Sequence, residues 1–185
     1  MSRQFWSEGI LWATSSGTAV ANSVTETILV PNVTIPGNFL QDGRTLRLTA
    51  MGAYGTTATP TLQFRIRWGG VSGTVLAASG AITTPSGAGG GASMTACWTL
   101  QAILQVRANG SSGTLMTNGE IILYTTGTAA GIDYPLASGS TGGTTPVAVT
   151  ADLTADTALS LTATWGTANA ANSIQLVQYN IEALN

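Results

Sequence analysis

The sequence predicts an all-β fold, namely a jelly-roll-like β-sandwich of about eight to ten antiparallel strands with an N-terminal arm. Three observations support this prediction. Apolar and polar residues alternate along several short runs, turns rich in glycine, proline and asparagine separate the runs, and no run favours a helix over a strand. Regularly spaced short strands are typical of sandwiches and barrels. We assign the arm to residues 1–18 and the sandwich, as a single domain, to residues 19–185.

The stretch from Arg44 to Gly70 carries the clearest pair of strands. Two alternating runs flank the turn sequence GTTATP, and each run has one apolar and one polar face because successive side chains on a strand point to opposite sides. Arg65 and Arg67 project from the polar face of the second run, and Arg47 lies beside them if the two strands pair. The apolar positions are Leu46, Leu48, Ala50, Gly52 and Tyr54, then Leu62, Phe64, Ile66 and Trp68.

Further strands are predicted at residues 23–30, 74–78, 93–108, 114–125, 147–153, 159–165 and 173–184. A helix is an alternative for residues 100–107, although the period of two favours a strand. Asn118-Gly119 is either a bulge or a tight turn, and the change of apolar parity after Leu176 indicates a bulge or burial on both faces. We expect residues 79–92 to form a flexible connection rich in glycine and serine, and residues 126–146 to form a long polar loop that faces outward.

The proposed arm is rich in large apolar side chains, which are costly to leave in water. It therefore either packs along the core of its own domain or docks on a partner. Chain termini are usually loose unless something holds them, so an arm that orders on assembly fits the pattern. The candidate contact residues are Phe5, Trp6, Ile10, Leu11 and Trp12.

The chain carries little charge. Charged residues make up 8% of the sequence, against about 25% in a typical protein, and all basic residues are arginine. One interpretation is a β domain whose polar faces are built from threonine. The interpretation that we favour is a surface that other subunits cover, because a net charge of −2 gives an isolated monomer little charge-based solubility.

The same composition excludes several partners. A phosphate-binding surface needs clustered cations, so we expect no nucleic acid as partner. No apolar run approaches the ~20 residues of a membrane span, and Glu8 interrupts the N-terminal segment before a signal-peptide core develops. We expect no membrane partner.

We predict no enzymatic activity, no cofactor and no metal. The sequence has no histidine and no lysine, so histidine-based general bases and Schiff-base chemistry are missing. Cys97 is the only cysteine and is predicted to be a buried small apolar residue. Asp152 and Asp156 could share Ca²⁺ or act as a glycosidase pair, but we favour turn formation for both. The sequence GAGGG at 87–91 lacks the lysine and helix of a phosphate loop and is interpreted as a linker.

Arginine and tryptophan give two further candidate sites. Arg65 and Arg67 could clamp an acidic group, but we favour a solvated or intersubunit face on which they pair with Glu120 or Glu182. The tryptophans could stack on sugars, but three of them are in phase with apolar strand positions, which predicts core packing.

Several motifs resemble structural proteins of tailed-bacteriophage virions. These are the lead-in Pro36–Gly43, the run Thr45–Gly52, Thr59-Pro60-Thr61-Leu62 continuing to Gly70, the run Trp98–Arg107, and the closing Asn172-Ser173-Ile174. The resemblance covers roughly residues 23–183 and rests on packing and turn residues.

The resemblance implies a jelly-roll virion protein, such as a capsid decoration (cement) protein or a head-fibre or tail-tip module. It implies a homotrimer that contacts the major capsid protein on the capsid surface, with Arg65 and Arg67 at a subunit contact. The alternative is a tail-fibre or tail-tip module that binds a receptor or host glycan through residues 79–92 and 126–146. The family offers no catalytic residues to transfer.

Overall fold

The computed structural model describes residues 7–12, 16–30, 33–56, 58–85, 94–125, 131–139, 142 and 145–184, and only the backbone of most of residues 7–12. These residues form strands and no helix, which confirms the all-β prediction. Accordingly, no helix of the described part is long and apolar enough to cross a bilayer.

Nine of the described strands have five residues or more, within the predicted number. The long strands are β1 (Ser7–Trp12), β5 (Thr45–Gly55), β6 (Thr61–Trp68), β7 (Thr74–Ala78), β9 (Ala96–Ala108), β10 (Gly113–Tyr124), β11 (Gly131–Ser138), β13 (Thr157–Trp165) and β14 (Ser173–Leu184). The short strands are β2 (Val20–Ala21), β3 (Thr27–Ile28), β4 (Val33–Ile35), β8 (Ile82–Thr83) and β12 (Val149–Ala151).

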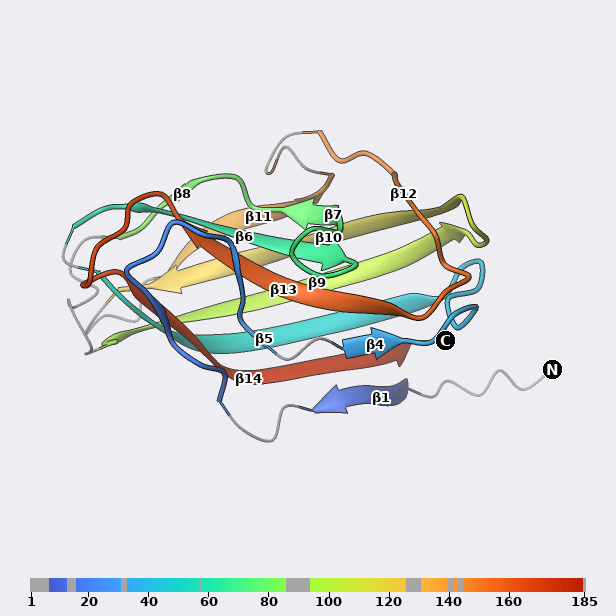
Figure 1. The fold of residues 1–185 in the computed structure, drawn as a ribbon, viewed down its shortest axis with the longest axis horizontal. Coiled ribbons are helices and arrows are strands. Elements are labelled where there is room, and N and C mark those ends of the chain that lie inside the picture. The colour runs from blue at the N-terminus through green and yellow to red at the C-terminus, as the bar shows by residue number, and fades with distance from the viewer. Residues whose placement is uncertain are drawn as a thin grey trace.

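The strands form two layers that face each other (Figure 1). Neighbours in one layer follow the order β1-β14-β5-β9-β10-β11, and the path continues through β7-β6-β13-β3 in the other. Phe64 of β6 meets Trp98 of β9 with ring centroids 5.1 Å apart, which places the apolar faces of the two layers in contact. The result is a jelly-roll-like sandwich, as predicted.

Both sides of the sandwich are closed. On one side β11 pairs with β10 and, through Ala137 and Ser138, with β7. On the other side lie residues 16–30, which we call the strap. The strap crosses the edge of the sandwich from one layer to the other. The strap bonds to β14 through β2 and to β13 through β3. It therefore joins β14 of one layer to β13 of the other without adding a full strand to either.

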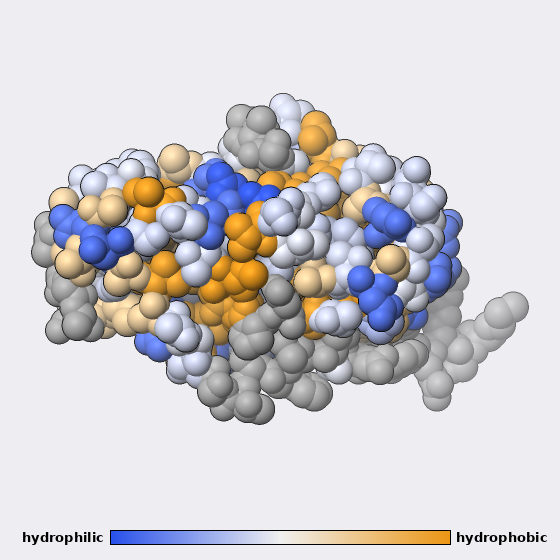
Figure 2. Space-filling model, viewed as in Figure 1, coloured by the Kyte–Doolittle hydropathy of each residue, from blue (hydrophilic) through white to orange (hydrophobic). Residues whose placement is uncertain are grey.

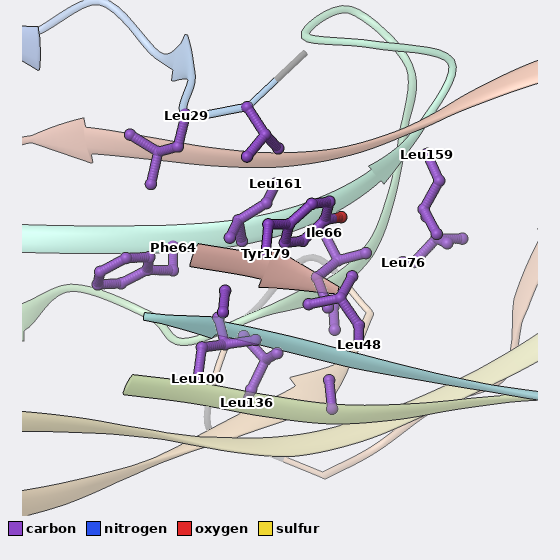
Figure 3. Close-up of a cluster of buried hydrophobic side chains, with 14 of the residues drawn as sticks. Leu29, Leu48, Phe64, Ile66, Leu76, Leu100, Leu136, Leu159, Leu161 and Tyr179 are labelled. Atoms are coloured by element: carbon purple, nitrogen blue, oxygen red, sulfur yellow. The ribbon is translucent and has the colours of Figure 1, made fainter. Parts of the chain in front are cut away.

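The core lies between the layers and is almost wholly apolar (Figure 3). Leu48, Leu100 and Leu136 come from one layer, and Phe64, Ile66 and Leu161 from the other. In β5, β6 and β9 every second residue is directed inward, so the alternation in the sequence becomes the inward face of the sheet. Trp68, Trp98 and Trp165 are buried, as predicted.

The strands at 45–55 and 61–68 exist as predicted but do not pair with each other. β5 lies between β9 and β14, whereas β6 lies between β7 and β13 in the opposite layer. Arg47 is therefore not beside Arg65 and Arg67, because the connection between the two strands crosses from one layer to the other. Sequence neighbours that alternate alike can belong to different sheets, and this pair does.

Other local predictions divide into those that hold and those that fail. Residues 96–108 form a strand and not a helix, and β14 has the predicted bulge, since its register shifts between Leu176 and Gln178. Asn118-Gly119 is neither bulge nor turn, because both residues pair in register with β9 and β11. Residues 131–138, predicted as loop, form β11, because their backbone closes the gap between β10 and β7.

Two predictions at the ends of the alternating runs are also corrected. Only Thr27–Ile28 of the predicted strand 23–30 is a strand, because the strap pairs with β13 over these two residues alone as it crosses the edge of the sandwich. Cys97 is exposed and not buried, because the inward positions of β9 are its neighbours Ala96 and Trp98.

Candidate functional site

The outer surface of the layer β14-β5-β9-β10 is hollowed into a groove of about 530 Å³. The side chains that line the groove come from positions of these strands that face away from the core, because a strand presents alternate residues to opposite faces. An adjoining hollow of about 400 Å³ shares Arg47, Gln101 and Glu120 with the groove. The side chains that line the groove are Arg47, Thr49, Met51, Thr99, Gln101, Glu120, Ile122, Gln178, Asn180 and Glu182.

A row of polar side chains crosses the middle of this groove. Asn180 of β14 is paired with Thr49 of β5, Thr49 with Gln101 of β9, and Gln101 with Glu120 of β10. Strands lie about 4.8 Å apart, so the row extends about 14 Å across the sheet. Directly paired side chains on one face are neighbours in space, and the row therefore forms a continuous polar line perpendicular to the strands.

Two further rows of side chains flank this line, one on each side. One consists of Gln178, Met51, Thr99 and Ile122, again paired strand by strand. The other consists of Glu182, Arg47, Ile103 and Asn118. Met51 and Ile103 are exposed, although they are large and apolar. The groove thus alternates hydrogen-bonding groups with patches of apolar surface.

The groove is weakly charged. Arg47 Nη1 lies 3.4 Å from Glu182 Oε2, and the two side chains are 42% and 28% exposed. An ion pair as open as this one contributes little to stability, but it neutralises the arginine. Glu120 is the remaining charged side chain among the lining residues, so the formal charge is one positive against two negative, or −1.

One buried acceptor in the groove has no partner. Asn180 Oδ1 is enclosed and accepts no hydrogen bond from the described residues. A buried polar atom without a partner is uncommon and costs free energy. Asn180 lines the groove, so a ligand there could supply the missing donor once the amide turns to bring Oδ1 out of its enclosed position.

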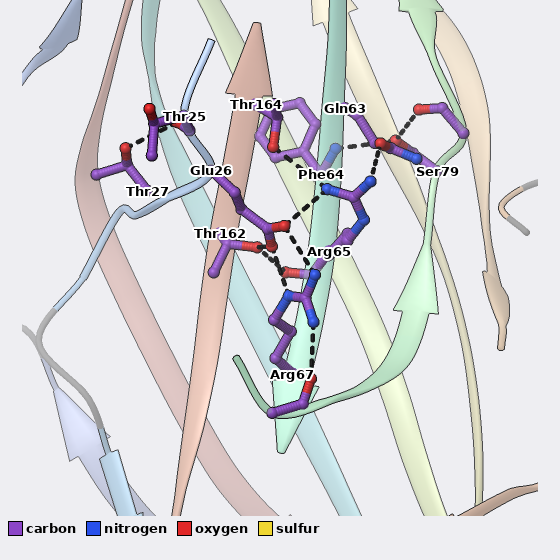
Figure 4. A network of polar contacts seen from close by, with 12 residues as sticks. Thr25, Glu26, Thr27, Gln63, Phe64, Arg65, Arg67, Ser79, Thr162 and Thr164 are labelled. Atoms are coloured by element: carbon purple, nitrogen blue, oxygen red, sulfur yellow. Dashed lines mark hydrogen bonds and ion pairs between the residues drawn. The ribbon is translucent and has the colours of Figure 1, made fainter. Parts of the chain in front are cut away.

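The outer surface of the opposite layer has a different construction, which we call the arginine face. Glu26 of the strap lies over β6 and β13, between Arg65 and Arg67 (Figure 4). Arg67 donates from Nε and Nη2 to the two carboxylate oxygens at 2.5 and 2.7 Å, and Arg65 Nη1 donates at 2.9 Å. Thr162 Oγ1 donates to the same carboxylate at 2.5 Å.

Both arginines make further hydrogen bonds within the chain. Arg67 Nη1 donates to the carbonyl of Gly73 at 2.7 Å, and Arg65 donates to Thr164 and Gln63. The side chains of Arg65, Arg67 and Glu26 are only 21%, 14% and 14% exposed. Burial alone raises the pKa of Glu26, but the hydrogen bonds from Arg67 and Thr162 and the charges of both arginines outweigh it, so the pKa lies below its ordinary value.

These contacts correct the predicted partners of the arginines. Arg65 and Arg67 pair with Glu26, and not with Glu120 or Glu182, which line the groove in the other layer. The sequence concealed this contact because Glu26 precedes Arg65 by 39 residues and lies in a segment that was predicted to be a strand.

The structure describes three of the five predicted N-terminal contact residues. The other two, Phe5 and Trp6, lie outside the described residues. Ile10, Leu11 and Trp12 belong to β1, whose backbone pairs with the edge of β14. Part of the proposed arm therefore runs along its own domain, while the boundary after residue 18 and the contact role of these five residues stay predictions.

The two aspartates take part in turn structure. Asp152 Oδ1 accepts hydrogen bonds from the backbone nitrogen and hydroxyl of Thr154, at 2.9 and 2.6 Å, and these bonds lower its pKa. Asp156 Oδ1 accepts from the backbone nitrogen of Gly37 at 2.8 Å. Across the described ranges, no three His, Cys, Asp or Glu residues gather as they would around a metal ion. The glycine run at 87–91 lies outside the described residues.

The groove was not predicted from the sequence. Alternation places Thr49 and Gln101 on outward faces, and that signal was visible. Their meeting with Asn180 and Glu120 depends on strand order, and β5 receives its neighbours from positions about 50 and 130 residues further along the chain. Local pattern carries no information of that kind.

Comparison with known proteins adds a remote likeness in structure alone. No protein-family model matches the chain, and no curated protein matches it. A solved structure of the CBM2 module of the evolved Dit of Lactobacillus casei BL23 phage J-1 is similar over 99% of this chain and 98% of that one. The identity is 11% and the TM-score 0.38, a level at which the likeness carries no argument about function.

Proposed function

We propose that this protein is a structural component of a tailed-bacteriophage virion, and more narrowly a homotrimeric capsid decoration protein. In this role it binds the major capsid protein on the outside of the particle and stabilises the capsid. It acts by binding and not by catalysis, and it needs no cofactor. The motifs between Pro36 and Ile174 that resemble virion proteins support the class of protein.

The arginine face supports a docking role. Its charged side chains are bound to each other within the chain, because Glu26 binds both Arg65 and Arg67, and two positive charges against one negative leave a formal charge of +1. Beside the two arginines, the strap presents Val24 outward, and this residue is 53% exposed. The cores of protein interfaces are depleted of free charge and contain exposed apolar groups. Figure 2 shows this side of the molecule, with hydrophilic residues above a stretch of hydrophobic surface.

The arginines therefore have an indirect part in this proposal. Most of their donors are engaged within the chain and few are left for a neighbouring subunit, since each arginine makes three such hydrogen bonds. Instead they hold the strap in place, and the strap supplies the contact surface. Residues 1–18 would add a second contact to the capsid or to a neighbouring trimer.

Mass and particle binding test the proposal together. Light scattering on the purified protein is expected to give three times the monomer mass of 18.8 kDa, and added protein is expected to sediment with capsids stripped of it. Val24→Glu places a charge in the proposed contact and should abolish both. Ile132→Glu on β11 is the matched control, since Ile132 is 46% exposed. A stable monomer that also fails to bind capsids would refute the proposal.

A second candidate function is a tail-fibre or tail-tip module that binds a receptor or glycan. The groove favours it, because a concave surface of 530 Å³ lined by hydrogen-bonding side chains is suited to a small ligand. Antibody labelling of intact particles in the electron microscope separates the candidates. Label on the head supports decoration, and label on the tail supports the second candidate.

A further inference from the structure

We propose that the groove on the outer surface of β14-β5-β9-β10 binds a neutral carbohydrate chain. The proposal goes beyond capsid decoration and does not depend on it, and it deepens the second candidate function, which uses the same groove. The groove and the arginine face lie on the outward surfaces of opposing layers, so a molecule attached through the arginine face still presents the groove to solvent.

The lining of the groove matches a ligand rich in hydroxyl groups. The amides of Gln101, Gln178 and Asn180 each combine a donor and an acceptor. A hydroxyl group also both donates and accepts, so amides and hydroxyls can pair in either sense. The enclosed Oδ1 of Asn180 lacks a donor, and a ligand hydroxyl can supply one when the amide turns toward the groove.

The charges of the groove exclude anions. Arg47 is already bound to Glu182, and Glu120 adds a negative charge that no lining cation offsets. A phosphate, a nucleic acid or an acidic sugar would meet net repulsion. A neutral ligand avoids this cost, and the carboxylate of Glu120 can accept hydrogen bonds from its hydroxyl groups. The apolar surface of Met51 and Ile122 can contact the carbon–hydrogen faces of sugar rings.

The extent of the groove favours a chain over a single sugar. Its polar row spans about 14 Å across four strands. The adjoining hollow of about 400 Å³ continues beyond Arg47 and Gln101. Together they offer an elongated surface that one sugar ring would leave partly empty.

The position of the groove disfavours a peptide strand as occupant. Peptides that join a sheet bond to its free edge, whereas β5 and β9 are paired on both sides. Recognition in the groove must therefore pass through side chains, and those side chains are mainly amides, hydroxyls and carboxylates.

Binding to defined glycans tests the proposal. The full-length protein is applied to an array of neutral and acidic oligosaccharides, and run in native gels that contain soluble starch, galactomannan or xyloglucan. Binding to a neutral glycan is expected. Gln101→Ala and Asn180→Ala should each weaken it about tenfold, since each removes hydrogen bonds to the ligand. Gln105→Ala, an exposed glutamine on β9 outside the groove, should bind as the unmodified protein does.

The failing outcomes are separable. Binding to no neutral glycan, or binding only to acidic ones, overturns the proposal, and so does a Gln101→Ala protein with unchanged affinity. If Gln101→Ala instead breaks the oligomer, the groove is a contact between copies and the proposal is wrong. Capsid attachment is measured on the same variants, and Gln101→Ala should leave it unchanged. A failure of capsid decoration would therefore appear in a different assay.

Discussion

The two outer faces of this sandwich differ in how their polar groups are satisfied. On the arginine face, Glu26 crosses from the strap and binds Arg65, Arg67 and Thr162 at distances of 2.9 Å or less. On the groove face, the single ion pair of Arg47 with Glu182 is open to solvent, and Asn180 Oδ1 has no partner among the described residues. A face whose polar groups bind each other supports structure, and a face whose polar groups remain available can bind something else.

The largest expected difference between the faces is in stability. Glu26→Ala leaves two little-exposed arginines without their carboxylate, and loss of one partner from a buried ion pair costs about 3 kcal/mol or more. Glu182→Ala removes one exposed pair and should cost less than about 1 kcal/mol. Urea denaturation of both variants measures the two free energies of unfolding. Equal losses would show that the faces do not differ as described.

A smaller loss is expected where the strap passes over the layers. A Cβ at Gly17 would lie 2.3 Å from the backbone oxygen of Leu29, within the strap itself. Gly17→Ala must displace one of these segments, and such overpacking costs about 1–3 kcal/mol. Thr18→Ala, an exposed neighbour, serves as control and should unfold at the temperature of the unmodified protein. An unchanged unfolding temperature for Gly17→Ala would mean that the strap does not hold the sandwich closed.

Lowering the pH should weaken the arginine face by a smaller amount, through protonation of Glu26. Because the pKa of Glu26 is lowered in the folded state from its ordinary value of 4.5, its contribution is complete above that value and is lost as pH falls through the lowered pKa. The free energy of unfolding should therefore fall below about pH 4.5. The loss should be smaller than that of Glu26→Ala, because protonated Glu26 still occupies its place. Glu26→Ala should lack this component of the pH dependence, and identical pH profiles would contradict the assignment.

The smallest expected effect is at Cys97, which shares its face of β9 with Thr99 and Gln101. Its exposed thiol should react fully with a thiol reagent in the native protein, without denaturant. Cys97→Ser should change the free energy of unfolding by no more than about 0.5 kcal/mol, as expected of surface substitutions. Labelling that requires denaturant would show that this end of the groove face is covered.

The sequence predicted strands better than it predicted their neighbours. Alternation located β5, β6, β9, β13 and β14, because burial of every second residue leaves a local trace. It could not show that β5 and β6 belong to different layers, since both strands have the same alternation of apolar and polar residues. The contacts of Glu26 in the strap were also not predicted. Its partner Thr162 lies 136 residues away, and local alternation does not show which distant residues meet.

The place of β14 in the sheet has a consequence for the order of folding. β14 is the last strand along the chain, yet it pairs with β1, β2 and β5 and supplies Asn180 and Glu182 to the groove. Pairings of such long sequence separation form slowly, on a scale of roughly milliseconds to seconds in small β proteins. During synthesis β5 must wait with one edge unpaired until β14 leaves the ribosome. An unpaired edge can capture a strand of another chain, so this interval is when the nascent protein is most exposed to aggregation.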